Sequence, residues 1–133
     1  MYEIEIVKVF RAGHALRLPN GGLEDYHKHD WQVTVCVGSG ERLDALETVM
    51  DFHVLEKVVD EVLAAWDGKN LNKVEGFRDG DQGAWNPSAE RVAEMVAKRV
   101  DAKLREMDKG EAARVLWAQT TEAPGCIARY RMK

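Results

Sequence analysis

Two segments near the start of the sequence alternate between polar and apolar residues over a length typical of long β-strands. The first segment, residues 2–12, places these residues on one face: Tyr2, Ile4, Ile6, Lys8, Phe10 and Ala12. The second, residues 27–38, places these on one face: Trp31, Val33, Val35 and Val37. Residues 18–26 between them are rich in Pro, Asn and Gly, which predicts a loop. The two segments therefore predict an antiparallel pair of strands, and the first alternation continues in phase to His14.

The middle of the sequence changes to helical spacing. Residues 51–66 carry an apolar stripe at steps of three and four, and Asp51 stands where an N-cap is expected. The stripe consists of Phe52, Leu55, Val59, Val62 and Trp66. Residues 67–85 are polar and Gly-rich and predict a long connection. A second helix is expected to start at Asn86-Pro87, with a stripe of Val92, Val96, Val100 and Leu104.

The end of the sequence predicts two further strands, at residues 115–119 and 126–132. The element order is then strand, strand, helix, helix, strand, strand, within one domain of residues 1–133. This order predicts an α+β fold with a four-stranded antiparallel sheet and two helices on one of its faces. The other face and both edges of such a sheet remain open, which favours an oligomer that pairs the edges.

Composition excludes several classes of function. The formal net charge of -4 argues against nucleic acid as the main partner. No apolar run reaches the roughly 20 residues that cross a membrane, and residues 1–6 do not resemble a signal peptide, so a cytoplasmic location is expected. Cys36 and Cys126 lack metal-binding or redox spacing and are expected to be buried free thiols.

Three of the four histidines lie within 16 positions of the sequence. His27 and His29 are two apart at the head of a strand, so both rings point the same way, and His14 ends the preceding strand. Three histidines and an open position are typical of catalytic zinc, whereas ordinary surface histidines are the alternative. His53 stands alone near a helix start and is interpreted as structural or solvent-facing.

Several blocks of the sequence, in the right order, resemble the 6-pyruvoyl-tetrahydropterin synthase family. They are Phe10-Arg-Ala-Gly-His14, His27-Lys-His29-Asp-Trp, Val49-Met-Asp51-Phe-His-Val-Leu55, Trp66-Asp-Gly-Lys-Asn-Leu-Asn72, Asn86-Pro-Ser88-Ala-Glu90 and Gly125-Cys-Ile. The resemblance implies the tunnelling fold, in which three sheets join as a barrel and two trimers commonly stack as a hexamer. It also implies active sites between subunits, a zinc ion on His14, His27 and His29, and a substrate such as 7,8-dihydroneopterin triphosphate.

The sequence departs from the family pattern at the residues that move protons. The family uses a cysteine assisted by an Asp-His pair, but the loop before His27 contains no cysteine, and Gly68 stands where the histidine is expected beside Asp67. Glu24, three residues before His27, resembles a variant branch that carries Glu in place of Cys and cleaves the side chain to give 6-hydroxymethyl-dihydropterin. Glu24 and Asp67 are therefore the candidate bases, with a solvated loop acid and a loop or cap residue as the respective alternatives.

The sequence also departs from the family that it resembles at the residues expected to line the substrate pocket. Thr120 stands where the family has the glutamate that anchors the pterin ring, although Glu122 is two positions away and a local shift could restore it. By resemblance Ser88 and Thr121 are further candidate pterin contacts, with a first-turn helix residue as the simpler alternative for Ser88. Lys28, Arg17 and Lys69 could meet a phosphorylated substrate, with surface charge as the alternative reading.

The sequence thus predicts a zinc-dependent lyase acting on a pterin, with an altered reaction. The alternatives are a zinc- and pterin-binding protein without turnover, and an oligomeric structural module in which zinc ties two strands together.

Overall fold

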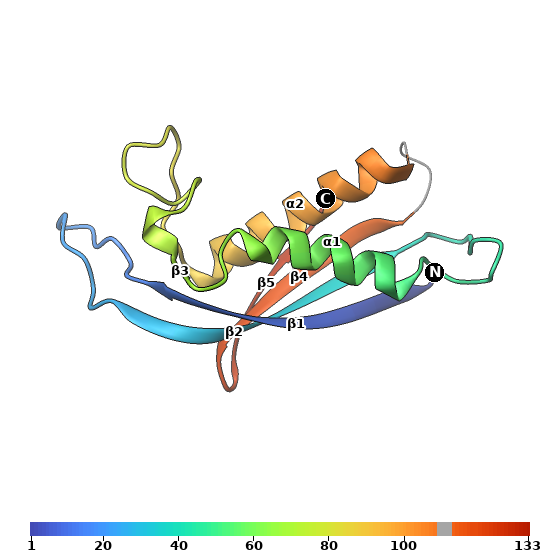
Figure 1. Ribbon diagram of the computed structural model, residues 1–133, viewed down its shortest axis with the longest axis horizontal. Helices are drawn as coiled ribbons and strands as arrows, with labels where there is room; N and C mark the ends of the chain where they lie inside the picture. Colours follow the sequence, from blue (N-terminus) through green and yellow to red (C-terminus); the bar gives the residue numbers. More distant parts are fainter. Residues whose placement is uncertain (109–112) are drawn as a thin grey trace.

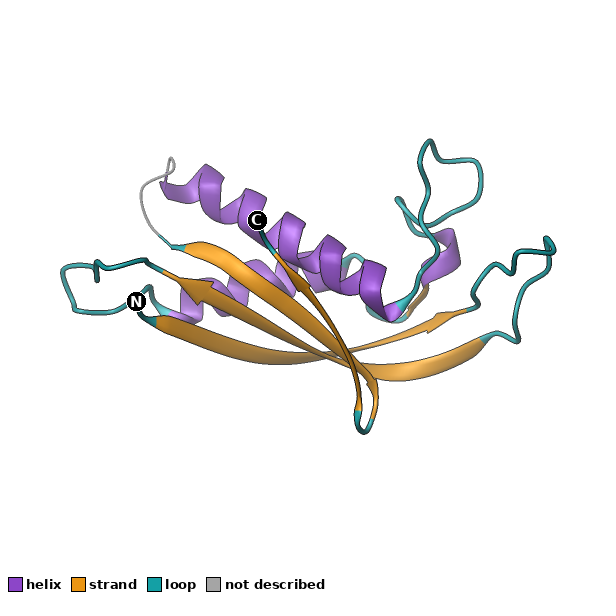
Figure 2. Cartoon of the chain, turned by 180° about the vertical axis from the view of Figure 1, so that it is seen from behind, coloured by secondary structure: helices purple, strands orange, loops and turns teal. Residues whose placement is uncertain are grey.

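The computed structural model describes residues 1–108 and 113–133, which form a curved sheet with two α-helices packed on the same face (Figures 1 and 2). The strands are β1 (Glu3–His14), β2 (His27–Gly38), β3 (Lys69–Asn70), β4 (Arg114–Ala123) and β5 (Cys126–Arg131). The helices are α1 (Phe52–Ala64) and α2 (Ala89–Asp108), with a 3-10 turn at Leu71–Lys73. The predicted α+β architecture is confirmed.

The sheet has the strand order β3-β1-β2-β4-β5 within the described residues. β1 and β2 are antiparallel along their whole length, from Glu3 opposite Gly38 to His14 opposite His27, as the alternation predicts. β4 extends the sheet on the other side of β2. The short strand β3 was not predicted: it pairs in parallel with only Ala12 and Gly13 of β1 and comes from the segment expected to be a plain connection.

The core lies between the sheet and the helices. Alternate residues of β2 form its floor, and Trp31, Val33, Val35 and Val37 are at most 1% exposed. Helix α1 buries Leu55, Val58, Val59, Val62 and Leu63. Phe52 was predicted to share this stripe but is 52% exposed, and Leu55 is the first residue that α1 buries. Trp66 lies beyond the end of α1 yet is fully buried, so its expected place in the core is confirmed.

Helix α2 begins three residues after the predicted cap. The Ser88 hydroxyl accepts a hydrogen bond from the Arg91 amide, and the Ser88 carbonyl accepts the first helical bond from the Val92 amide, so Ser88 is the N-cap. The expectation for Asn86 was wrong because its side-chain amide is committed to the backbone of Arg17. Tertiary contact overrides the local capping preference at this point.

The two cysteines are free, as predicted, but they differ in exposure. Cys36 is fully buried, and this burial raises the pKa of its thiol to about 12. Cys126 is exposed at the start of β5, so its predicted burial was wrong. No helix in the described ranges is both long and apolar enough to cross a bilayer.

Candidate metal centre

The register of β1 and β2 brings three histidines together at one end of the sheet. His14 lies directly opposite His27, and Ala12 lies opposite His29, so all three rings project from the helix-covered face. The ring centroids are 4.5 Å apart for His14 and His27, 4.6 Å for His27 and His29, and 5.2 Å for His14 and His29. Trp31 packs against the edges of two of these rings and anchors the cluster to the core.

Glu122 from β4 completes the cluster. Its Oε1 lies 2.8 Å from His14 Nε2, 3.0 Å from His29 Nε2 and 3.9 Å from His27 Nε2. The possible donor atoms of the four residues all lie within 4.8 Å of one another. The side chain of His14 is 2% exposed, those of His29 and Glu122 are 23% and 27% exposed, and that of His27 is 39% exposed, so the group is buried at His14 and accessible to water at His27.

Backbone carbonyls fix the orientation of two of the rings. His14 Nδ1 lies 2.7 Å from the Pro87 carbonyl oxygen, and His27 Nδ1 lies 2.8 Å from the Asp25 carbonyl oxygen. A carbonyl only accepts, so each Nδ1 carries a proton, and Nε2 of each ring lies on the side of Glu122. A second partner of this kind commonly fixes the tautomer of a metal-binding histidine.

The inner nitrogens lack the partners that buried polar atoms normally have. Nε2 of His14 and Nε2 of His29 are buried and make no hydrogen bond among the described residues, although Glu122 Oε1 is close to both. Burial lowers the pKa of His29, and the neighbouring histidines act in the same direction against the opposing charge of Glu122. Three imidazole nitrogens and a carboxylate oxygen thus converge on one point, an arrangement that a cation between them would stabilise.

The donor set fits zinc in type and in size. Imidazole nitrogens and a carboxylate oxygen are common zinc ligands at about 2.0–2.2 Å, which places tetrahedral ligands about 3.3 Å apart. Small side-chain movements would bring the four donors to these separations. His14, His27 and His29 are the three residues expected from the sequence, and the structure places them together.

Two asparagine side chains hold the chain as it leaves the metal cluster. The Asn72 amide accepts from the Ala15 amide at 2.8 Å and donates to the Ala15 carbonyl at 2.7 Å. The Asn86 amide makes the same pair of bonds to the backbone of Arg17, at 2.8 and 3.0 Å. Each asparagine therefore acts as a short piece of strand, and the segment after His14 keeps a fixed position beside α2.

The two predicted bases lie outside the four-residue cluster. Glu24 is half-buried, and its carboxylate accepts a hydrogen bond from the Leu16 amide at 2.9 Å. Asp67 is exposed, and its carboxylate accepts from the Arg11 amide at 2.9 Å. Both carboxylates thus hold loop or strand backbone in this protomer.

The predicted pterin contacts are divided between buried and accessible positions. Thr120 is fully buried, and its hydroxyl donates to the Ala89 carbonyl at 2.9 Å. Thr121 and Ser88 are partly exposed, and Ser88 caps α2 next to the Pro87 carbonyl that holds His14.

Of the three basic candidates, Arg17 is committed to the protein itself. Its guanidinium donates to the carbonyls of Phe77 and Trp85 and pairs with Asp79. Lys28 and Lys69 are exposed and line a small hollow together with Arg11.

A β-bulge explains why Glu122 reaches the metal cluster. Thr121 pairs with Ile127 and Ala123 pairs with Cys126, so Glu122 is an extra residue on β4. Bulges bend the strand and redirect a side chain, and the pairing of β4 with β2 ends at Thr121. Sequence reasoning placed Glu122 near a pterin-anchoring position but missed it as a possible metal ligand, because a bulge leaves no period-2 signature.

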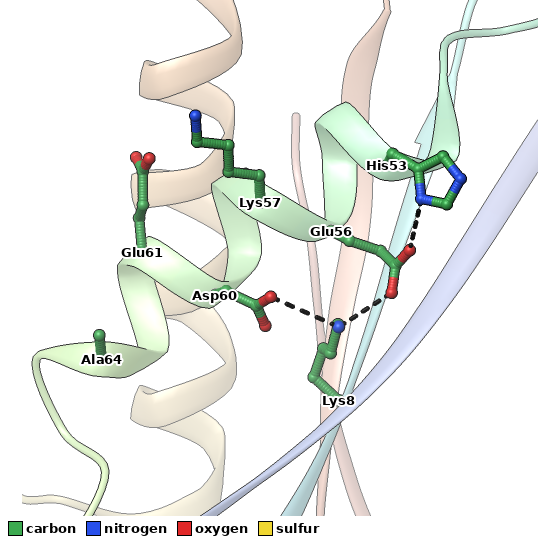
Figure 3. Close-up of a pocket in the computed structure, with 7 residues that line it drawn as sticks. All are labelled: Lys8, His53, Glu56, Lys57, Asp60, Glu61 and Ala64. Carbon is green, nitrogen blue, oxygen red and sulfur yellow. Dashed lines mark ion pairs between the residues drawn. The ribbon is translucent and has the colours of Figure 1, made fainter.

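A second group of histidine and carboxylates lies in a shallow groove between β1 and α1 (Figure 3). Lys8 Nζ lies 2.9 Å from Glu56 and 3.5 Å from Asp60, and His53 Nδ1 lies 3.5 Å from Glu56. The side chain of His53 is 92% exposed, which agrees with its predicted solvent-facing role. This surface cluster holds one histidine against three for the metal centre.

The comparisons with known proteins agree with the fold. Residues 3–133 match the family described as 6-pyruvoyl tetrahydropterin synthase. A protein of Pyrococcus furiosus named dihydroneopterin monophosphate aldolase is 32% identical over 108 residues, which are 77% of this chain and 82% of that protein.

Two solved structures show the same fold. The 6-pyruvoyl tetrahydropterin synthase of Caenorhabditis elegans is 22% identical, with a TM-score of 0.76 over 99% of this chain and 96% of that one. The synthase of Plasmodium vivax is 14% identical, with a TM-score of 0.73 over 100% and 99% of the two chains.

Proposed function

The chain belongs to the 6-pyruvoyl tetrahydropterin synthase family, and on that premise we propose that it is a zinc-dependent lyase acting on the side chain of a phosphorylated dihydroneopterin. The family and the aldolase relative support a lyase-type function in pterin metabolism. The observation that carries the proposal is the convergence of three Nε2 atoms, two of them on rings whose tautomers are fixed by the carbonyls of Pro87 and Asp25.

The relative favours cleavage of a carbon–carbon bond over elimination of triphosphate. In such a retro-aldol step, a base removes the proton of the 2′ hydroxyl. The C1′–C2′ bond then breaks as C2′ becomes the carbonyl carbon of the departing aldehyde. The electron pair passes to the pterin ring, and C1′ then takes a proton to give a hydroxymethyl group. When bound, zinc supplies a Lewis acid that acidifies the side-chain hydroxyls.

Glu24 is our candidate for the base. It lies three residues before His27, it is half-buried, and a positioned carboxylate can serve as a general base. The P. vivax synthase has also been solved with a glutamate, described there as a catalytic residue, replaced by alanine. Asp67 is the second candidate, although its exposed carboxylate is committed to the Arg11 amide.

The pterin is expected to lie near the accessible end of the metal centre. Ser88 and Thr121 are proposed to contact the ring, and Thr120 could join them only after giving up its bond to Ala89. Lys28 and Lys69 are proposed to meet the phosphate. We expect the protein to act in the cytoplasm.

The active unit is proposed to be a homotrimer or homohexamer with active sites between subunits. β1 is paired on its outer side only at Ala12 and Gly13, and β5 is the last strand of the sheet. Val7, Val9 and Ile127 are each more than half exposed. Open strand edges beside exposed apolar residues favour closure of the sheet by further copies. Light scattering coupled to gel filtration tests this, and a purely monomeric protein would contradict it.

The test of function is a product assay with zinc-loaded protein. Dihydroneopterin monophosphate and triphosphate are supplied separately, and the products are separated by chromatography and identified by mass. We expect 6-hydroxymethyl-dihydropterin to form, with at least a hundredfold loss of rate in Glu24→Gln, since positioned general bases contribute about 10²–10⁴-fold.

Several results would contradict parts of this proposal. A pyruvoyl product would show that elimination is the reaction, and an unchanged rate in Glu24→Gln would remove that residue from catalysis. If no product forms but pterins raise the melting temperature, the protein is a pterin-binding paralogue. If zinc removal lowers stability and no pterin binds, the metal has only a structural role.

A further inference from the structure

Glu122 occupies the place where a three-histidine site would admit a substrate or water. Its Oε1 lies 2.8 and 3.0 Å from two of the inner nitrogens and 3.9 Å from the third. A catalytic zinc keeps one position free of protein ligands, whereas four protein ligands close the site. The position of this one carboxylate therefore decides whether the site is open or closed in the absence of substrate.

The backbone favours this position of Glu122 over a pterin-anchoring one. As the extra residue of the bulge between Thr121 and Ala123, it lies beyond the last pair of β4 with β2. Its side chain is 27% exposed and has no positively charged partner other than the histidines among the described residues. Three imidazole nitrogens and the carboxylate oxygen converge there, and this set of donors suits a bound metal ion.

We propose that Glu122 is the fourth protein ligand of the metal ion in the substrate-free protein and that an incoming ligand must displace it. This inference rests on metal binding by the proposed active site, but it does not require turnover. A carboxylate in this position reduces the net charge of a divalent site to +1 and excludes water from the position that reacts. Displacement by substrate would leave the carboxylate beside the bound side chain.

Coordination of the metal ion by Glu122 would also affect the binding of small anions. While Glu122 holds the fourth position, a small anion must compete with a tethered carboxylate. Once the carboxylate is removed, the same anion meets an open position and a higher positive charge. Azide therefore reports directly on whether Glu122 is bound to the metal.

The experiment uses the full chain loaded with Co²⁺, whose absorption bands report on its ligands, and needs no pterin. Wild type, Glu122→Ala and the control Glu56→Gln are titrated with Co²⁺ and then with azide. Glu56→Gln removes a carboxylate next to a histidine in the surface groove and matches the change in charge. We expect Glu122→Ala to bind the metal at least tenfold more weakly, since changes even beyond the direct ligands cost about 10–100-fold.

Azide should bind to Co²⁺-loaded Glu122→Ala at least tenfold more tightly than to wild type, with a larger spectral change, and Glu56→Gln should match wild type. Equal metal and azide affinities for Glu122→Ala and wild type would overturn the inference. If Glu122→Ala does not fold, Glu122→Gln keeps the size of the side chain and removes its charge, with the same expectations.

The outcomes separate this inference from the proposed function. Altered cobalt spectra without turnover of any pterin would support the role of Glu122 and contradict the lyase. Loss of pterin binding in Glu122→Ala with unchanged metal and azide affinity would overturn the inference and make Glu122 a ring anchor. A wild-type protein that binds no metal would overturn both.

Discussion

Two clusters in the molecule contain histidine and carboxylate side chains, and they differ in how their geometry is fixed. In the metal centre, strand register and backbone carbonyls set the direction of the rings before any ligand is present. In the surface groove, His53 and Glu56 are neighbours at i and i+3 on α1, and Lys8 of β1 reaches Glu56 and Asp60 (Figure 3). Residue type is similar in both, but the constraint on each side chain differs.

The difference shows what makes a set of ionisable residues a ligand site. The groove satisfies its charges internally, because Lys8 lies between Glu56 and Asp60. Among the residues that the structure describes, the metal centre leaves two buried nitrogens without hydrogen bonds, and its carboxylate is paired with the three histidines alone. A rigid cluster whose polar atoms lack partners can bind a cation. An exposed cluster whose charges already pair with one another contributes little to stability.

The largest expected effect is that of removing the metal. At a free zinc concentration one thousand times the dissociation constant, binding stabilises the folded protein by about 4 kcal/mol. Chelation should therefore lower the melting temperature by roughly 10 °C for a chain of this size. Calorimetry with and without chelator measures this shift, and His53→Ala should show the same shift as wild type. A melting temperature insensitive to chelator would remove the distinction between the clusters.

The next effect separates the histidines of the two clusters. His29→Ala deletes one convergent donor and should weaken zinc binding by roughly 100-fold, the upper range for changes around metal sites. His53→Ala deletes a 92% exposed ring and should leave zinc affinity unchanged. Competition with a coloured chelator measures both variants. Equal losses of zinc affinity in the two variants would mean that zinc does not distinguish the metal centre from the surface groove.

A smaller effect is expected at the two helix caps. Asp51 caps α1 near the surface groove, and Ser88 caps α2 beside Pro87. Replacing either by Ala should cost about 1 kcal/mol of unfolding free energy. Only Ser88→Ala should also weaken zinc binding, because the Pro87 carbonyl that orients His14 then loses support. Urea unfolding and zinc competition check the two parts, and weaker zinc binding in Asp51→Ala would contradict this reasoning.

The smallest effect is expected in the groove itself. The hydrogen bond between Lys8 and Glu56 raises the pKa of Lys8 above 10.5 and lowers the pKa of Glu56 below 4.5. Its contribution is therefore present between these values, and it is lost as pH falls through the lowered pKa or rises through the raised one. Lys8→Met should leave the melting temperature at pH 7 nearly unchanged, because the pair is exposed. A large drop in melting temperature that disappears in high salt would show that the groove contributes more to stability than its exposure indicates.

Much of the fold could be predicted because periodicity reports burial directly. The alternation around Trp31 and the helical stripe around Leu55 correspond to the two sides of the core. Phe52 fits the same stripe but is exposed, because burial depends on the tertiary contacts of an element and not on residue spacing alone. Cys126 follows a turn whose exposure depends equally on the three-dimensional arrangement.

The metal site could be predicted in part for a similar reason. His27 and His29 share a face through strand period alone, and His14 joins them through the pairing of β1 and β2. The carbonyls of Pro87 and Asp25 carry no side-chain signal, and the approach of Glu122 depends on the bulge. The cap at Ser88 was missed because the long-range bonds of Asn86 with Arg17 outweigh its local preference.

The asparagine clamps on Ala15 and Arg17 have a consequence for the ageing of the protein. Deamidation turns the donating NH₂ into an oxygen, which would then face the carbonyl that it formerly held. Asn86 is followed by Pro87, which has no backbone N–H to attack the side chain and form the cyclic imide. Asn72 is followed by Lys73 and has no such protection. Of the two clamps, the one on Ala15, directly after His14, should therefore be lost first, while the clamp on Arg17 stays intact.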